Sequence, residues 1–474
     1  MTSRPRRIAL KPDYQVSRIP EQSLASPVNM YAEVQSGKGA FPLHCMPGSK
    51  VRKAFGSPIR GQAVIDGVHY VVAGETLYTM VGAVATSCGS VLGGGLVQIV
   101  PNRFQVGIVS GQKFYVWDKE HLTLTEVAQT DENGFGGIEW LCVDNGLGIF
   151  GTAGGDRFSV TGINDFTTIN PTDVATAENR ADPLVTGVVA NSTLYLMGLD
   201  TIEVWDNTGA ADFPFDRTMV LEIGAVSRDT VQVIGRDVYF VGIVSIDNAR
   251  QIGLYRLSGT SAQKVSTNAL DRILERAELA GTLPWAASLV WGIDGHVFYR
   301  LTTSVGSFDY DVGLNLAVRV GSGVWLDGEE PLPSALTTHA RVGGVNVFGD
   351  VSGRLLDMTF GENSEGGNTF VREFTTPVTG DLGRETIVDR IELECKTGVG
   401  SNTVDPVVYL SVSKDGGHTW GQQRAGQLRK IGAYGREVSW WRLGKARDWV
   451  FRFRMTDDAP LKVVGVWADV EQCR

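Results

Sequence analysis

The chain has 474 residues, of which 43% are apolar, 20% are charged and 58 are glycines. This composition excludes an intrinsically disordered chain and is sufficient for a sizeable core. The glycine content exceeds the usual ~7% without a collagen-like period, which favours many turns between short strands. The five cysteines are scattered and form no C-x-x-C pair, so neither a disulfide framework nor a zinc site is indicated.

The formal net charge of −10 is unevenly distributed. Residues 1–60 carry ten Lys and Arg against three Asp and Glu, and residues 424–454 carry nine against two. Net acidity argues against a general nucleic-acid-binding protein, because such binding depends on neutralising phosphates. Two basic segments on an acidic body favour contacts with acidic surfaces of partners or other copies, with a plain solvated surface as the alternative. We expect no secretory signal and no membrane helix, because no long apolar run is present.

From about residue 59 onwards, one pattern recurs at spacings of 36 to 58 residues. A turn rich in Gly or Asn precedes a strand in which aromatic or β-branched residues alternate with others. The seven instances begin at Asp66, Asn102, Asn145, Asn191, Arg236, Asp294 and Gly344. A period of about 40–50 residues with several short strands is typical of a β-propeller. We therefore predict an all-β fold with a six- or seven-bladed β-propeller over residues 59–362; a series of sandwiches is the alternative.

One helix is predicted at residues 268–280, because apolar side chains there repeat on one face and Gly281 follows. Ser266, Thr267 or Asn268 can cap its start. We interpret it as an insertion packed on the rim of a blade. A helix that docks a partner is the alternative.

The pattern changes on both sides of the propeller. After a polar, Gly-rich break at residues 361–370, alternating segments at 387–394, 407–413, 449–455 and 461–467 predict strands. We assign residues 363–474 to a C-terminal antiparallel β domain resembling a sandwich. Residues 1–58 contain several prolines and no repeat unit. We expect an extended N-terminal arm that packs on the C-terminal domain as part of one platform.

The sharpest local motif is an Asp-box, S-x-D-x-G-x-T-W, formed by Ser413, Asp415, Gly417, Thr419 and Trp420. In such a hairpin turn the Asp carboxylate accepts backbone N–H groups, the Gly adopts positive φ, and the Trp anchors the hairpin in the core. Sialidases carry several such boxes. Here one copy occurs outside the repeats, so a structural role is predicted.

Other chemical signals are weak. The sequence has no metalloprotease, P-loop, nucleophile-elbow or EF-hand motif, and its six histidines are far apart. We interpret His69 and His296 as structural. Asp309 and Asp311 flank Tyr310, and a glycosidase could combine carboxylates from different blades, so a sialidase-like glycoside hydrolase is the least favoured hypothesis. We expect no catalytic residue, no cofactor and no metal site.

Several stretches resemble the podovirus tail-hub, or packaged-DNA stabilisation, family, the nozzle proteins of short-tailed phages. Residues 27–33 with 46–48 resemble its opening segment, and residues 264–270, 295–301, 308–311 and 323–325 resemble its blade pattern G-H-x-F-Y-x-L…Y-D…W. Residues 413–420 and 441–451 resemble the phage tail β module. Val312, Gly313, Leu314 and Asn315 depart from the turn that usually precedes the Trp.

This resemblance implies a non-enzymatic structural protein of the virion tail, assembled in the cytoplasm of the host bacterium. It implies a homo-oligomeric ring, expected to be a hexamer, attached below the portal–adaptor (head-to-tail connector) complex. The ring would extend the DNA channel, retain packaged DNA until ejection, and dock tail fibres or tailspikes and a plug or needle protein. Double-stranded DNA would pass the lumen without specific binding, and this chain alone would not insert into a membrane.

The two basic segments supply candidate assembly contacts for that role. These are Arg4, Arg6, Arg7, Arg429, Lys430, Arg436, Arg442 and Arg447. A propeller that recognises glycans or a receptor at the tail tip is the alternative function.

Overall fold

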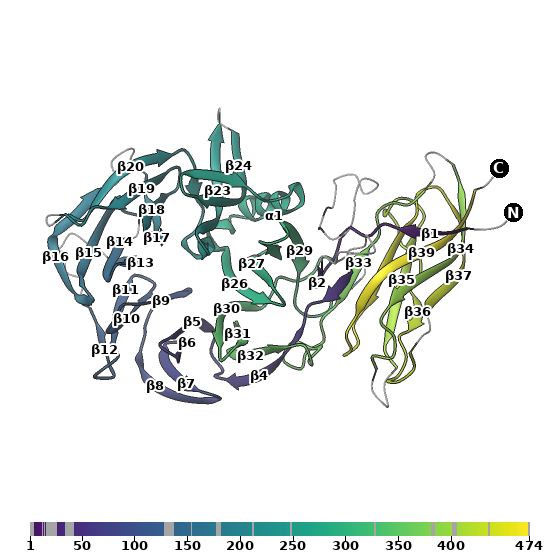
Figure 1. Cartoon of the computed structure of the whole chain (residues 1–474), viewed down its shortest axis with the longest axis horizontal. Coiled ribbons are helices and arrows are strands. Elements are labelled where there is room, and N and C mark those ends of the chain that lie inside the picture. Colours follow the sequence, from purple (N-terminus) through teal and green to yellow (C-terminus); the bar gives the residue numbers. More distant parts are fainter. Residues whose placement is uncertain are drawn as a thin grey trace.

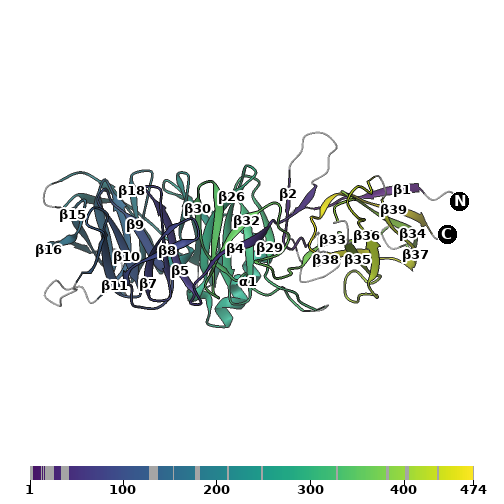
Figure 2. The same ribbon diagram turned by 90° about the horizontal axis from the view of Figure 1, so that it is seen from below.

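The computed structural model describes residues 4–11, 13, 15, 26–33, 42–127, 137–152, 154–176, 182–210, 213–246, 249–326, 329–380, 384–400, 405–434 and 437–472. A ring of sheets and a smaller two-sheet domain lie side by side along the long axis (Figure 1). Both chain termini lie at the far end of the smaller domain, as the view from below also shows (Figure 2). No helix among the described residues is long and apolar enough to cross a membrane.

Seven antiparallel sheets follow one another around the ring in the described part of residues 48–359. In chain order they are β5(Ile59–Ile65)–β6(Val68–Ala73)–β7(Thr76–Val81)–β8(Val84–Ser90); β9(Val97–Pro101)–β10(Gln105–Ser110)–β11(Lys113–Asp118)–β12(Thr123–Glu126); β13(Ile138–Asp144)–β14(Leu147–Thr152)–β15(Arg157–Ile163)–β16(Asp165–Thr176); β17(Leu184–Ala190)–β18(Thr193–Gly198)–β19(Ile202–Asn207)–β20(Phe215–Leu221); β21(Gly224–Ala225) and β22(Gln232–Ile234) with β23(Asp237–Ile246)–β24(Ala249–Ser258)–β25(Ser261–Lys264); β26(Ala287–Ile293)–β27(His296–Thr303)–β28(Gly306–Asp311)–β29(Leu316–Val320); and β30(Leu336–Val342)–β31(Val345–Asp350)–β32(Arg354–Thr359)–β4(Gly48–Ala54). The first strands of neighbouring sheets contact one another around the axis, as β5 does with β9 and β30. This is the predicted all-β propeller.

The recurring turns each join the first two strands of a sheet. In the first sheet, Asp66 and Gly67 both have positive φ, at 51° and 79°, and Asp294 and Gly295 repeat this at 49° and 83° in the sixth. Two-residue hairpin turns of this hand match the twist of the flanking strands, and Asp, Asn and Gly tolerate them best. The Asp, Asn and Gly residues that these turns require therefore recur once per sheet, which produces the repeat visible in the sequence.

The propeller is closed by a strand from the N-terminal arm. β4 pairs antiparallel with β32, with Val51 opposite Leu356. The assignment of residues 48–54 to an arm outside a propeller beginning at residue 59 is therefore corrected. β32 needs an outer partner to complete its sheet, and the chain leaves the propeller directly after β32, so a strand from the other end supplies it.

The predicted helix is confirmed as α1 (Asn268–Leu279), which lies between β25 and β26 and is followed by the short helix η4 (Leu283–Trp285). Its apolar face packs into the core shared by the fifth and sixth sheets. Thr267 is the N-cap residue but makes no side-chain cap bond; Ser266 Oγ instead donates to Asp271 Oδ1 at 2.6 Å. The helix is thus an insertion packed on the propeller.

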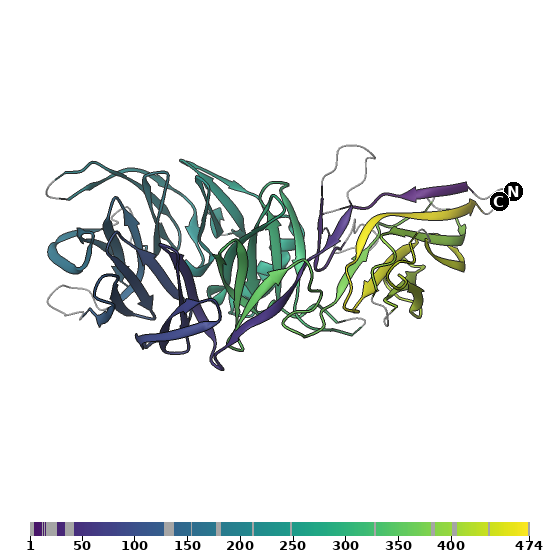
Figure 3. The same cartoon turned by 60° about the horizontal axis from the view of Figure 1, so that its bottom comes forward.

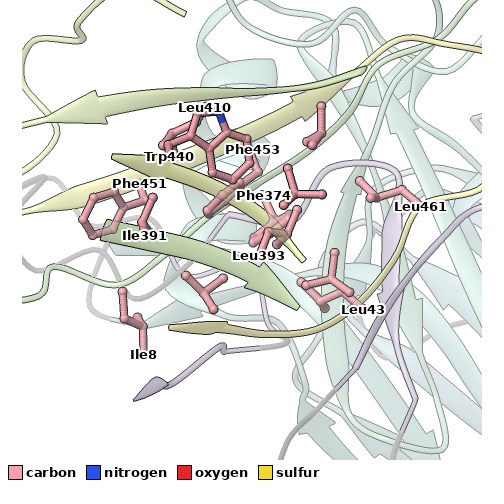
Figure 4. Close-up of a cluster of buried hydrophobic side chains, with 14 of the residues drawn as sticks. Ile8, Leu43, Phe374, Ile391, Leu393, Leu410, Trp440, Phe451, Phe453 and Leu461 are labelled. Carbon is pink, nitrogen blue, oxygen red and sulfur yellow. The ribbon is translucent and has the colours of Figure 1, made fainter. Parts of the chain in front are cut away.

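The smaller domain is a sandwich of a six-stranded and a four-stranded sheet. The first runs β2(Met30–Ala32)–β3(Leu43–Cys45)–β39(Lys462–Gln472)–β34(Thr386–Cys395)–β37(Val438–Ala446), with β1(Arg4–Ile8) also paired to β39; the second runs β33(Arg372–Thr375)–β38(Val450–Met455)–β35(Val407–Ser413)–β36(Arg424–Gln427). Ile8 and Leu43 from the arm join Phe374, Trp440 and Phe453 in one continuous core (Figure 4). The arm therefore completes both domains.

The arm also forms the junction between the domains, where it crosses from sandwich to propeller (Figure 3). Asn29 is buried with φ of 55°, and its Nδ2 donates to the carbonyls of Gly321 at 2.8 Å and Val371 at 2.7 Å. Its Oδ1 accepts the Gly321 N–H at 2.9 Å. One amide side chain thus ties the end of β29, in the sixth sheet of the propeller, to the residue before β33 of the sandwich.

Candidate assembly surfaces

The Asp-box forms the turn that follows β35. Ser413 Oγ lies 2.7 Å from Asp415 Oδ1, and the Gly417 N–H donates to Ser413 Oγ at 2.8 Å. The Thr419 hydroxyl and N–H both donate to the Asp415 carboxylate, at 2.5 and 2.9 Å. These hydrogen bonds lower the Asp415 pKa to about 2. The box orders its own turn, and its polar groups are occupied by one another.

Trp420 does not enter the core, which corrects the anchoring role predicted for it. Its indole is half-buried, and the Arg452 guanidinium of β38 lies 4.3 Å from the ring centroid. The core position belongs to Trp449, which is 1% exposed and whose Nε1 donates to Thr386 Oγ1 at 3.0 Å. The Arg452 side chain is 8% exposed and stacks on the Trp420 indole, which lies outside the core cluster of the sandwich.

The N-terminal arginines lie on β1, an outer strand of the six-stranded sheet. Arg4 stands opposite Val470, and Arg6 is exposed. Arg7 is partly buried: its Nη2 donates to the Val464 carbonyl at 3.1 Å, and its guanidinium lies 5.7 Å from the centre of the Trp467 ring. These residues therefore belong to an ordered strand.

The second basic group is spread along one edge of the sandwich. Arg429 and Lys430 lie just after β36, Arg442 is exposed on β37, and Arg447 follows the far end of that strand. Arg436 lies outside the described residues. The order β37–β34–β39–β1 separates this edge from the N-terminal arginines by two strands, or about 14 Å at ~4.8 Å per strand. The structure does not bring the two groups together into one patch.

Between these two edges lies a surface that the sequence did not reveal, here called the arginine–tryptophan face. It is the solvent side of the six-stranded sheet. Arg7 lies over Trp467, and Arg390 lies over Trp441 with 5.2 Å to the ring centroid. Carboxylates alternate with them: Trp467 Nε1 donates to Glu394 Oε2 at 2.9 Å, and Arg390, Glu392 and Asp469 form ion pairs. The face is mixed in charge, and Trp441 is exposed on it. Its signal is the alternation at 390–394, which marks Arg390, Glu392 and Glu394 as outward; a register shift between Val388 and Arg390 interrupts the pattern before it.

The carboxylates considered for glycosidase chemistry are engaged elsewhere. Asp309 is fully buried and forms a two-pronged ion pair with Arg300, at 2.7 Å for both contacts. Asp311 lies 2.6 Å from His296 Nδ1 and accepts two backbone N–H groups. His69 hydrogen-bonds Gln62, and burial lowers its pKa to about 4. Within the described residues, no three His, Cys, Asp or Glu side chains gather as metal ligands.

The axis of the propeller is crossed by Arg228. This residue begins the short helix η3 (Arg228–Thr230), which interrupts the inner edge of the fifth sheet. Its guanidinium donates to the carbonyl of Leu96, which directly precedes β9 of the second sheet, at 3.0 Å, and to that of Glu139 on β13 of the third sheet. Its Nε pairs with Asp229 at 2.9 Å. A side chain that bonds across the axis leaves no open tunnel for a duplex in a single propeller.

Two family models match this chain. The one described as "Bacteriophage P22 Gp10, beta-propeller" matches residues 18–287, and the one described as "Bacteriophage P22 Gp10, beta-sandwich" matches residues 371–471. No curated protein sequence matches.

Solved structures match this chain only at low likeness. The computationally designed Ika8 protein is 12% identical, with a TM-score of 0.34 over 65% of this chain and 99% of its own. The Pan2 WD40 domain of Neurospora crassa is 8% identical, with a TM-score of 0.41 over 66% and 95%. An extracellular domain of a putative one-component system from B. thetaiotaomicron is 8% identical, with a TM-score of 0.44 over 88% and 62%.

Proposed function

Because this chain belongs to the family of bacteriophage P22 Gp10, the tail-associated DNA-stabilisation proteins of short-tailed phages, we propose that it is the tail hub, or nozzle, of its virion. Copies assemble into a ring, expected to be a hexamer, below the portal–adaptor complex. The ring extends the DNA channel, retains packaged DNA, and docks tail fibres or tailspikes and a plug. The protein is structural and non-enzymatic, and assembly takes place in the host cytoplasm.

The observation that carries this proposal is the combination of a closed, acidic propeller with a sandwich whose larger sheet contains three strands of the N-terminal arm. Residues 59–362 carry 18 Lys and Arg against 35 Asp and Glu. An acidic wall repels the phosphate backbone, so DNA can pass without being bound. Since Arg228 crosses the propeller axis, the channel in this proposal runs between copies rather than through one propeller.

The sandwich is the part we assign to the adaptor. Its two basic edges and the arginine–tryptophan face between them offer cations and exposed aromatic rings, the residue types enriched in protein interfaces. Charges at the rim of such an interface mainly set the encounter rate and the register, and salt weakens them. Attachment should therefore depend on these residues more than folding does.

The test is a head-complementation assay. DNA-filled heads lacking this protein are mixed with wild-type protein or with a variant in which Ser replaces Arg4, Arg6 and Arg7, and DNA retention is read by nuclease protection. We expect the variant to attach poorly and the heads to leak, with high salt weakening the wild type in the same direction. The control removes three exposed propeller cations, Arg157, Arg236 and Arg341, in the same way. Full retention by the arm variant at moderate salt would contradict the adaptor assignment.

A further inference from the structure

A groove of about 820 Å³ lies between the first and second sheets of the propeller. Its apolar lining comes from Ile65, Val68, Tyr70, Phe104, Trp117 and Leu122. The size and the predominantly apolar lining are those of binding sites rather than of packing defects. Thr79, Thr86 and Cys88 add small polar groups along its length.

The mouth of the groove is unusually apolar for a free surface. Val81 is 82% exposed, Leu122 67% and Phe104 54%. Contiguous exposed apolar side chains of this kind mark interaction sites in soluble proteins. Arg103 lies beside them with its guanidinium 5.2 Å from the centre of the Phe104 ring, and among the described residues no carboxylate pairs with it. The groove thus offers an apolar slot with Arg103 at the rim; Lys119, which is paired with Asp66, and Glu120 also line it.

Two exposed apolar side chains and a carboxylate, which match the apolar lining and the cation of the groove, lie elsewhere on the same chain. We call this set the knob: Glu275, Leu279 and Trp285. Leu279 is 87% exposed at the end of α1, and Trp285 is 82% exposed in η4. The turn between them is held by the Thr282 N–H, which donates to the Ala277 carbonyl at 2.9 Å. Glu275 is exposed one helical turn before Leu279, and no cation in the described part of the chain pairs with it.

The groove and the knob lie on opposite faces of the propeller. The groove is built from turns that join first to second and third to fourth strands, whereas the knob sits in the connection from the fourth strand of one sheet to the first strand of the next. Because successive strands are antiparallel, these two kinds of connection leave from opposite faces. One copy therefore cannot fill its own groove, whereas a neighbouring copy can.

We propose that the knob of one copy docks in the groove of the next. Trp285 and Leu279 enter the apolar slot, and Glu275 meets Arg103 at the rim. Such a contact joins two different surfaces of identical chains, so it repeats from copy to copy and closes into a ring when the rotation per copy permits. This inference rests on the proposed ring and identifies its propeller contact.

Chemical cross-linking tests the geometry directly. Cys88 already lines the groove and is partly exposed, so Leu279→Cys places a second thiol on the knob. A short bismaleimide should then link copies into ladders longer than dimers, because each copy carries one knob and one groove. The ladder should disappear when Cys88→Ser is added. Val351→Cys, a substitution at another exposed apolar position, is the control and should give no ladder. A ladder that survives Cys88→Ser would overturn the proposal.

A charge exchange tests the pairing. Arg103→Glu and Glu275→Arg should each weaken self-association about 3- to 10-fold, and the double variant should restore it. Trp285→Ala should weaken it at least about 30-fold, as expected for a central aromatic anchor. Sedimentation and circular dichroism would follow association and folding. If both single variants weaken association and the double variant does not restore it, the proposed contact between Arg103 and Glu275 is wrong.

The outcomes separate this inference from the proposed function. If Trp285→Ala protein still forms rings and complements heads, the knob is not the ring contact, and the tail-hub proposal stands. If wild-type protein neither associates nor complements heads, the tail-hub proposal fails. If wild-type protein is monomeric in solution, cross-linking is carried out on assembled particles, and the absence of a ladder there overturns the inference. Saturable binding of a saccharide in the groove of assembled particles would also overturn it.

Discussion

The sandwich and the propeller distribute their apolar side chains differently. The sandwich has one core that runs from Ile8 on β1 to Ala468 on β39. The propeller divides its buried residues among separate clusters, such as the one around Trp140 and the one around Trp291. A repeat architecture stabilised by contacts between neighbours responds locally to damage, whereas a single core responds as a whole.

The arm serves the two domains unequally. In the sandwich it supplies three strands and buried side chains such as Met30 and Leu43. In the propeller it supplies the outer strand of the last sheet, where Val51 is exposed, and two buried side chains, Tyr31 and Met46, in the cluster around Trp291. The sandwich therefore takes three strands of the arm into its single core, whereas the propeller takes one closing strand and two buried side chains.

The largest effect should come from emptying a large buried site in each domain. Trp449→Ala and Trp140→Ala should each cost about 3–5 kcal/mol, because both indoles are essentially unexposed. Hydrogen exchange should show the first loss across both sandwich sheets, and the second only in the sheets beside Trp140. Protection lost throughout the propeller in Trp140→Ala protein would break the comparison.

The next effect concerns the arm. Leu43→Ala should destabilise the sandwich by about 2–5 kcal/mol and leave the propeller transition in calorimetry unchanged, since Leu43 is 1% exposed in the sandwich core. Val51→Ala on β4 is the matched substitution and should stay within about 0.5 kcal/mol, as for other exposed sites. Equal losses in the two variants would mean that the arm serves both domains alike.

A smaller effect is expected at Trp420. Because this indole is half-buried and stacks against Arg452, Trp420→Ala should cost about 1–2 kcal/mol, the range of a desolvated cation–π contact with some apolar burial. Thermal unfolding of the sandwich is the measurement. A loss as large as that of Trp449→Ala would restore Trp420 as the core anchor.

The smallest effect is the acid sensitivity that two turn carboxylates, Asp415 in the sandwich and Asp165 in the propeller, give to their domains. Hydrogen bonds from Thr419 hold the Asp415 pKa at about 2; in the propeller, burial alone would raise the Asp165 pKa, but hydrogen bonds from Thr167, Thr168 and Gln105 bring it to about 2. Because both values lie below the unfolded pKa of ~3.9, their contribution is complete above about pH 4 and is lost as pH falls towards 2.

Substitution by Asn should remove that contribution in one domain at a time. Asp415→Asn should flatten the acid dependence of the sandwich transition between pH 4 and 2, and Asp165→Asn that of the propeller transition. Denaturant titrations at several pH values would measure both. An unchanged acid slope in either variant would mean that the carboxylate does not couple to folding.

Local chemistry explains what could be predicted from the sequence. The turns at Asp66 and Asp294 were recognisable because positive φ restricts the residues that occupy them, and the helix was recognisable from its apolar face and Gly281. The Asp-box likewise specifies a turn. It does not specify what covers its Trp, which depends on Arg452 from a strand about 30 residues later.

Long-range pairing explains what could not be predicted. Nothing near Val51 indicates that its partner is Leu356, since strand pairing depends on which edge remains open after the other sheets have formed. The groove could not be predicted from the sequence either. Val68 and Phe104 each resemble an ordinary residue at the end of a strand, and they form a groove only because two sheets lie side by side. The sequence shows that two segments are rich in Lys and Arg, but it does not show that they lie on separate edges of the sandwich.

The closure of the propeller by β4 has a consequence for synthesis. The ribosome makes β4 about 300 residues before β32, and at ~5–20 residues per second the strand waits about 15–60 s for its partner. β1 and β3 wait longer, because β39 is among the last strands to emerge. Unpaired strands invite aggregation, and lysines, arginines and prolines are the residues that suppress it. The basic, proline-containing arm is thus suited to remaining soluble on the nascent chain until the rest of the molecule has been translated.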